Sequence, residues 1–200
     1  MDVGISGQVA WFLSKLPSFA ALRRASAPSH PQYLHLLNPV PVSVLKIHSC
    51  PWGMTEPLAT AAECRVQVYW QTMPGEPEEA VDDQFRRWLE SAAGERPDLF
   101  PAPPVVEFPI RWLPGAAIPA DHELVTSLAR AVADSLGAPP PVEGIEGPCD
   151  LFVFAQEFGI PTVLWGPRGG NTHGADEYVE IESVVAAAKA LLLFVHRWCA

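Results

Sequence analysis

The sequence has no basic block and no long apolar run. Its 13 Lys and Arg residues stand against 23 Asp and Glu, for a formal net charge of −10. This balance argues against nucleic-acid binding, because phosphate contacts come from clustered Lys and Arg. Nowhere do 18 apolar residues follow one another, so we expect neither a membrane-spanning segment nor a membrane partner. An N-terminal basic region followed by an apolar core is also lacking, so we expect no signal peptide.

Cysteine is scarce, and the sequence lacks a Cys-x-x-Cys pair. The four cysteines are widely separated: Cys50, Cys64, Cys149 and Cys199. Such spacing is typical of reduced thiols in a cytoplasmic protein rather than of a disulfide scaffold. Charged residues make up only 18% of the chain and hydrophobic residues 48%, which is enough for one domain or two small ones.

Hydrophobic periodicity predicts alternating helices and strands in the first half. Pro17 is expected to kink or break the first helix, and residues 26–41 are a loop rich in Pro, Ser and His. The order helix, strand, strand, helix, strand is most of a ferredoxin-like α+β sandwich. In chain order the five predicted elements cover residues 7–25, 42–47, 64–71, 77–93 and 105–112.

The second half predicts helix and strand material of an α/β domain. A helix over residues 122–136 is expected to be capped by Asp121 and stopped by Gly137. Short buried strands are predicted at 150–155 and 162–165, with an unpaired sheet edge. A last helix covers 182–198, and its predicted inward face is Val184, Val185, Ala188, Leu192 and Val195.

A glycine-rich loop within residues 161–181 is the clearest candidate site. It follows the predicted strand at 162–165, contains His173 and leads directly into the last helix. Ligands of α/β proteins bind beyond the carboxyl ends of strands. A loop histidine is either a metal ligand or a merely solvated, hydrogen-bonded side chain. Asp176 and Glu177 are either ligands or bases, or they cap the helix and orient the loop, and we favour the latter.

This loop resembles the last motif of a family of zinc hydrolases that includes acetylornithine deacetylase, succinyl-diaminopimelate desuccinylase, aminoacylase and glutamate carboxypeptidase. The resemblance lies in the order Gly-Pro-x-Gly-Gly-x-x-His-x-x-Asp-Glu-Tyr-Val between an apolar strand and an apolar helix. It extends from about Asn38 to the end of the chain and is closest from Pro148 to Cys199.

The resemblance implies roles for the loop. His173 would be one ligand of a two-zinc centre, and Gly169, Gly170 and Asn171 would bind a substrate carboxylate, with Asp176 and Glu177 supporting the loop. The His-x-Asp motif, the other acidic ligands and the catalytic glutamate of that family are not found in this sequence. We therefore expect no catalytic residue here, a C-terminal portion of such an enzyme, and little or no activity of this chain alone.

The resemblance also implies a division of the chain. Residues 42–115 would be a ferredoxin-like lid and homodimerisation domain, residues 1–41 a helix and loop belonging to the lid, and residues 116–200 the end of an α/β catalytic domain. The implied reaction is hydrolysis of the amide bond in N-acyl amino acids or small peptides. The alternative is a non-catalytic dimerisation or small-molecule-binding module derived from the family.

Overall fold

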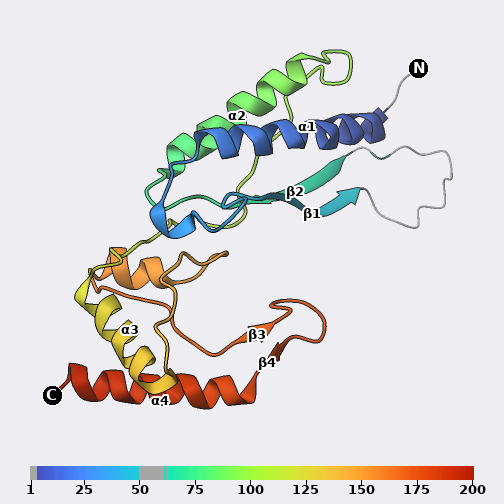
Figure 1. The fold of residues 1–200 in the computed structure, drawn as a ribbon. Coiled ribbons are helices and arrows are strands. Elements are labelled where there is room, and N and C mark those ends of the chain that lie inside the picture. The colour runs from blue at the N-terminus through green and yellow to red at the C-terminus, as the bar shows by residue number, and fades with distance from the viewer. Residues whose placement is uncertain (1–3, 50–60, 62) are drawn as a thin grey trace. The chain divides into compact units, whose positions relative to one another are not determined.

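The computed structural model describes residues 4–49, 61 and 63–200. The chain divides into two compact units (Figure 1). The N-terminal unit comprises Met1–Gly115 with Glu146–Pro148, and the C-terminal unit comprises Ala116–Ile145 with Cys149–Ala200. Within the described ranges, no helix is long and apolar enough to cross a membrane. Cys50 lies outside those ranges, and the other three cysteines are free thiols.

The N-terminal unit places two helices against an antiparallel pair of strands (Figure 1). Its elements are α1 (Gly4–Ser26), a short 3₁₀ helix η1 (Pro31–Tyr33), β1 (Val42–Ser49), β2 (Cys64–Trp70) and α2 (Glu78–Gly94). Each of the first four predicted elements is confirmed to within a few residues. In the ladder Val42 lies opposite Trp70, and a register shift occurs between Val44 and Lys46.

Aromatic side chains form the core of this unit. Phe19 of α1 is fully buried and contacts Phe85 of α2 edge to face, with ring centroids 5.1 Å apart. Trp70 of β2 stacks on Phe85 at 4.9 Å. Such pairs add about 0.5–1.5 kcal/mol each to the energy of burying their surface. The two helices and the sheet are therefore joined through one aromatic cluster.

The first helix continues through Pro17, although the sequence predicted a kink or break there. Proline removes one N–H from the helical ladder, but it does not prevent residues on both sides from packing. Leu16, Phe19 and Arg23 are all buried and lie on successive turns of one helical face. Tertiary burial along this stripe outweighs the lost hydrogen bond.

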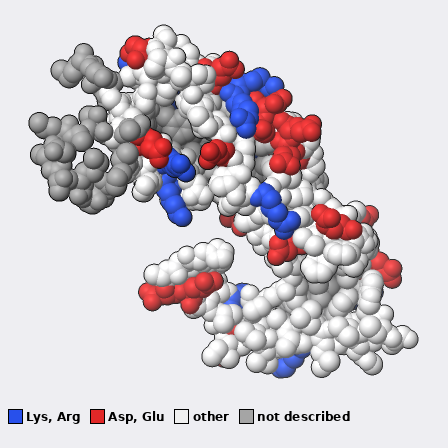
Figure 2. All heavy atoms as spheres, turned by 180° about the vertical axis from the view of Figure 1, so that it is seen from behind, with Lys and Arg blue, Asp and Glu red and all other residues white. Residues whose placement is uncertain are grey.

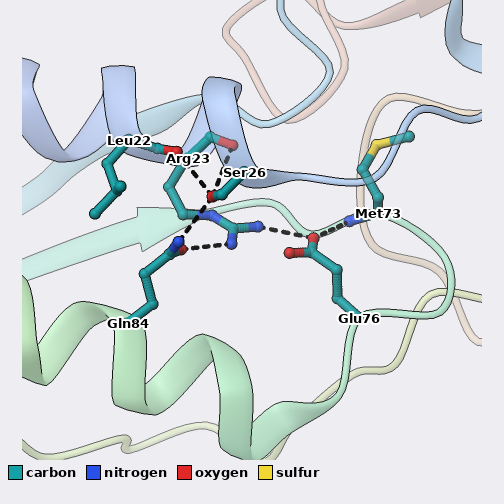
Figure 3. A network of polar contacts seen from close by, with 6 residues as sticks. All are labelled: Leu22, Arg23, Ser26, Met73, Glu76 and Gln84. Carbon is teal, nitrogen blue, oxygen red and sulfur yellow. Dashed lines mark hydrogen bonds and ion pairs between the residues drawn. The ribbon is translucent and has the colours of Figure 1, made fainter.

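A buried arginine links α1 to the start of α2 (Figure 3). Arg23 is 1% exposed, and its guanidinium donates to Glu76 Oε2 at 2.8 Å and to Gln84 Oε1 at 2.8 Å. Glu76 Oε2 also accepts the N–H of Met73 at 2.6 Å. The charge is thus paired and hydrogen-bonded, as a buried charge must be.

The strand predicted over residues 105–112 is not present. Val106 packs against the aromatic core, but Val105, Phe108 and Ile110 are exposed and the segment has no regular structure. Proline at 103, 104 and 109 removes N–H donors that a strand needs to pair. The described part of this unit therefore has helix, strand, strand and helix, and the complete ferredoxin-like order is not confirmed.

The C-terminal unit is built on two packed helices, α3 (Glu123–Leu136) and α4 (Ile181–Trp198) (Figure 1). His122, rather than the predicted Asp121, caps α3: its Nδ1 accepts the N–H of Leu124 at 3.1 Å. His122 is the cap because it occupies the position directly before the helix, from which a ring nitrogen can reach the second helical N–H. Gly137 ends the helix in the left-handed region, at φ 84°, as predicted.

Two predicted strands of this unit are wrong. Residues 151–152 are helical and lead into a short π-helix, η2 (Val153–Glu157), where a strand was expected at 150–155. Residues 162–165 have no regular structure, although Val163 and Trp165 pack against the helices. A short apolar run fits a buried strand or a buried helical turn equally well, and periodicity alone does not separate them.

The face by which α4 packs also differs from the prediction. Ser183, Ala187 and Ala190 are its buried residues, and Ala190 meets Leu128 and Val132 of α3. The predicted inward residues are all exposed: Val184, Val185, Ala188, Leu192 and Val195. The small residues allow α3 to approach closely, so the larger aliphatic stripe is left at the surface of this unit.

Candidate functional site

The glycine loop folds as a small hairpin at the N-terminal end of α4 (Figure 1). Its strands are β3 (Gly169–Gly170) and β4 (Tyr178–Val179), paired antiparallel with Gly169 opposite Val179 and Gly170 opposite Tyr178. The intervening residues 171–177 are exposed, and every predicted site residue lies on this hairpin. The structure therefore brings the sequence-predicted site residues together in one element.

His173 lies at the turn of the hairpin with its side chain exposed. Its backbone is left-handed, at φ 62°, and its N–H donates to Glu177 Oε2 at 3.3 Å. Asn171 and Asp176 are also left-handed, at φ 56° and 57°. Left-handed backbone at three non-glycine residues is strained, and such strain concentrates at functional sites. The contact with Glu177 fits the predicted orienting role, which remains a prediction, as do the ligand and substrate roles of this loop.

Hydrogen bonds within the turn itself fix the backbone around His173. The carbonyl oxygen of Asn171 accepts the N–H of Gly174 at 2.7 Å, and the Asn171 amide donates to the Asp176 carbonyl oxygen at 3.5 Å. These bonds lie on both sides of the imidazole-bearing residue. The loop is therefore a defined turn that presents one imidazole to solvent.

Gly169 and Gly170 are required by close approach of the opposite strand. A Cβ on Gly169 would lie 2.4 Å from the Tyr178 carbonyl oxygen, and one on Gly170 would lie 2.7 Å from the Tyr178 ring. Neither glycine has a positive φ. Their role is to admit the neighbouring backbone and ring, rather than to supply unusual dihedral angles.

The root of the hairpin is joined to α4 by residues that the sequence did not single out. The N–H of Arg168 donates to the Ser183 hydroxyl at 2.9 Å, and the N–H of Glu180 donates to the Arg168 carbonyl oxygen at 2.9 Å. The available signal was a lone serine among the apolar residues of the last helix.

Charge is distributed differently on the two units. On the face shown in Figure 2, acidic and basic side chains are interspersed over the N-terminal unit, whereas the C-terminal unit shows wide uncharged areas with acidic patches and few basic side chains. Along α2, Asp82 pairs with Arg86 and Asp83 with Arg87. Interspersed charges of both signs give no extended basic surface on that face.

The hairpin carries a single imidazole, that of His173. Within the described ranges, no three His, Cys, Asp or Glu side chains gather where they could hold a metal ion. Zinc takes three or four protein ligands, with imidazole nitrogen among those it prefers. An exposed imidazole on a preformed turn is therefore suited to contribute one ligand to a centre that needs others.

Two other histidines have structural positions. His30 Nδ1 accepts the N–H of Gln32 at 3.3 Å and caps η1, as His122 caps α3. In both rings Nδ1 is therefore engaged in a local hydrogen bond.

No curated protein matches this chain. Among solved structures, it is similar to the M20 family metallo-carboxypeptidase Sso-CP2 from Sulfolobus solfataricus, with a TM-score of 0.56 and 16% identity. The match covers 88% of this chain but 41% of that chain, so this chain spans less than half of the solved protein. At this identity the match shows a shared α/β fold.

A protein-family model gives the more specific result. The model for "Peptidase family M20/M25/M40" matches residues 30–197, which include α3, all but the last residue of α4, and the entire His173 hairpin. The chain belongs to peptidase family M20/M25/M40.

Proposed function

We propose that this chain is part of a metal-dependent amidohydrolase that cleaves the amide bond of N-acyl amino acids or small peptides. The observation that carries the proposal is the His173 hairpin, which lies inside the family match and presents an exposed imidazole on a strained, hydrogen-bonded turn. The chain supplies this hairpin and the lid, whereas the remaining metal ligands and the catalytic base come from polypeptide outside it.

In this proposal His173 is one ligand of a zinc centre that holds two ions. When bound, the metal ions polarise the substrate carbonyl and activate water for attack. Glu177 fixes the backbone at His173 by accepting its N–H, and Asp176 takes part in the turn through its carbonyl oxygen. These contacts fix the backbone from which the imidazole projects.

The substrate carboxylate is assigned to the same hairpin. Gly169 and Gly170 carry backbone N–H groups without side chains, and Asn171 follows them directly in the chain. Backbone N–H groups and a side-chain amide are suitable donors to a carboxylate. The specificity that follows is for amides that carry a free carboxylate next to the cleaved bond.

The N-terminal unit is assigned to the lid. Its two helices on an antiparallel strand pair make up four of the five elements of a ferredoxin-like domain, and we propose that residues 42–115, with the helix and loop at 1–41, form a lid that pairs with a second subunit. Residues 116–200 are assigned to the catalytic domain. The exposed aliphatic stripe on α4 supports this, because a helix with apolar residues on two faces is normally covered on both.

The proposal can be tested by placing this hairpin in a complete enzyme. Residues 166–183, which include the hairpin and the Ser183 hydroxyl at its root, would replace the segment that superposes on them in the Sulfolobus carboxypeptidase, and the zinc-loaded chimera would be assayed on N-acyl amino acids and dipeptides. We expect hydrolysis by the chimera and at least a hundredfold loss when His173→Ala is added. Equal activity of the two chimeras would overturn the ligand role. A zinc-free, inactive chimera would favour the alternative, a non-catalytic dimerisation or small-molecule-binding module.

A further inference from the structure

The His173 hairpin has little packing of its own to fix its direction. Each of its strands is two residues long, and residues 171–177 are exposed throughout. Two-stranded ribbons of this size are not independently stable in water. Three left-handed non-glycine residues in the turn add strain that only surrounding contacts can sustain. The hairpin must therefore be held at its root.

Ser183 lies at that root and is one of the buried polar side chains of the described structure, at 7% exposure. Its hydroxyl accepts the N–H of Arg168 at 2.9 Å and donates to the Glu180 carbonyl oxygen at 2.7 Å, with the Arg168 carbonyl oxygen 3.2 Å away. Arg168 directly precedes β3, and Glu180 directly follows β4. One hydroxyl therefore contacts both strands at the point where they meet α4.

The second contact at the root is exposed and contributes less. Arg168 Nε pairs with Glu180 Oε2 at 3.1 Å, but the two side chains are 79% and 45% exposed. Exposed ion pairs add little to stability, because solvent screens them and long side chains lose freedom in forming them. The buried hydroxyl is consequently the stronger of the two side-chain contacts.

Ser183 is itself fixed by the packing of α4. It lies on the same helical face as Ala187 and Ala190, which are buried, and Ala190 packs against Leu128 and Val132 of α3. The position of the hydroxyl is thus set by the α3–α4 pair. Through Ser183, the hairpin takes its direction from the most tightly packed part of the unit.

We propose that Ser183 is a positioning residue that fixes the His173 hairpin on α4. The role in metal binding rests on the proposed function, whereas the positioning of the hairpin does not. Loss of the hydroxyl would leave α4 intact and would release the root of the hairpin, so that His173 samples many directions.

The test uses the chain alone and compares Ser183→Ala with Ser183→Thr and Arg168→Gln. Ser183→Ala removes the hydroxyl, Ser183→Thr restores it, and Arg168→Gln removes only the exposed ion pair. Amide hydrogen exchange would be measured along residues 166–198, and the imidazole resonances of His173 would be recorded by NMR. Alanine is a good helix former, so α4 should fold in each variant.

We expect Ser183→Ala to raise exchange at the Arg168 and Glu180 amides at least tenfold, to shift the His173 resonances, and to leave the centre of α4 unchanged. Ser183→Thr should return both readouts to the wild-type values, and Arg168→Gln should change exchange less than twofold. Hairpin exchange within twofold of wild type in Ser183→Ala would overturn the proposal. An equal rise along α4 would also overturn it, because it would show general destabilisation.

These readouts need no metal and no substrate. A hairpin released by Ser183→Ala, in a chain whose hairpin graft fails to support hydrolysis, would refute the proposed function and leave the positioning role standing. A functional graft together with unchanged exchange in Ser183→Ala would support the proposed function and refute the positioning role. The two failures are therefore distinguishable.

Discussion

Substitution of Glu76 should lower the free energy of unfolding of the N-terminal unit more than substitution at any of its exposed ion pairs. Arg23 is 1% exposed and donates to Glu76 and Gln84, so Glu76→Ala leaves a buried guanidinium with one neutral acceptor. It also deprives the Met73 N–H of its acceptor. Breaking a buried pair by removing one partner costs about 3–5 kcal/mol.

The structure favours the lower end of that range. A surface pocket of ≈ 260 Å³ is lined by both Arg23 and Glu76, so water can reach the space left by the deleted carboxylate. We therefore expect a loss of about 3 kcal/mol in the free energy of unfolding. With a urea m-value of about 2 kcal/mol per molar, the midpoint should fall by roughly 1.5 M.

The assay is urea unfolding followed by tryptophan fluorescence, with hydrogen exchange of α1 and α2 to assign the change to this unit. Glu76→Gln keeps an oxygen acceptor and should lose about half as much as Glu76→Ala. Asp82→Asn, which breaks an exposed pair with Arg86, is the matched control and should lose no more than about 0.5 kcal/mol. A loss below about 1 kcal/mol for Glu76→Ala would show that the buried Arg23 guanidinium does not depend on Glu76 as its charged partner.

Three further predictions concern the hairpin, the cap of α3 and a surface ion pair. Gly169→Ala should open the β3–β4 pairing and raise hairpin amide exchange more than tenfold, whereas Gly166→Ala, where a Cβ meets nothing within 4 Å, should not; equal effects would contradict the close-approach argument. His122→Ala should destabilise the C-terminal unit by about 1 kcal/mol in thermal unfolding, and a loss under about 0.3 kcal/mol would show that the ring is not a cap. A hydrogen bond from Arg96 lowers the pKa of Asp98. The stabilising effect of this pair is present above the unfolded pKa of about 4 and is lost as pH falls through the lowered folded pKa. NMR titration should show the pKa of Asp98 rising in Arg96→Gln, and an unchanged pKa would contradict the pairing.

Much of the N-terminal unit could be predicted because its elements have long, regular hydrophobic patterns. The stripe containing Val81, Phe85 and Leu89 gives α2 one apolar face, and the structure buries these residues. Alternation from Cys64 to Trp70 likewise marks β2. Periodicity of this length carries information about both the type of element and the face that it buries.

The errors fall where the pattern is short or ambiguous. Residues 151–157 form helical turns where a strand was predicted. The prediction failed because a five-residue apolar run has no decisive period. In α4 both faces are apolar, so the sequence did not reveal that the alanines, rather than the valines and leucines, meet α3. The choice depends on close approach of a particular neighbour, which a single sequence does not encode locally.

The candidate site was located from its motif, but the contacts that support it were not. Glycines and a histidine between apolar segments predicted a ligand loop. Residues 169–179 form one hairpin that carries these residues, and ligand binding there stays a prediction. The anchoring role of Ser183 depends on the fold, because its partners Arg168 and Glu180 lie at different ends of the hairpin. Arg168 and Glu180 lie close together only because β3 and β4 pair in the folded hairpin.

The central claim is that this chain contributes one histidine to a metal centre whose other ligands lie outside it. The most direct test is the zinc content per chain after purification and dialysis against zinc. A single imidazole cannot retain zinc, so the account predicts a ratio near zero, unchanged in His173→Ala. A ratio near two, reduced by His173→Ala, would contradict it and show that the chain holds a complete centre.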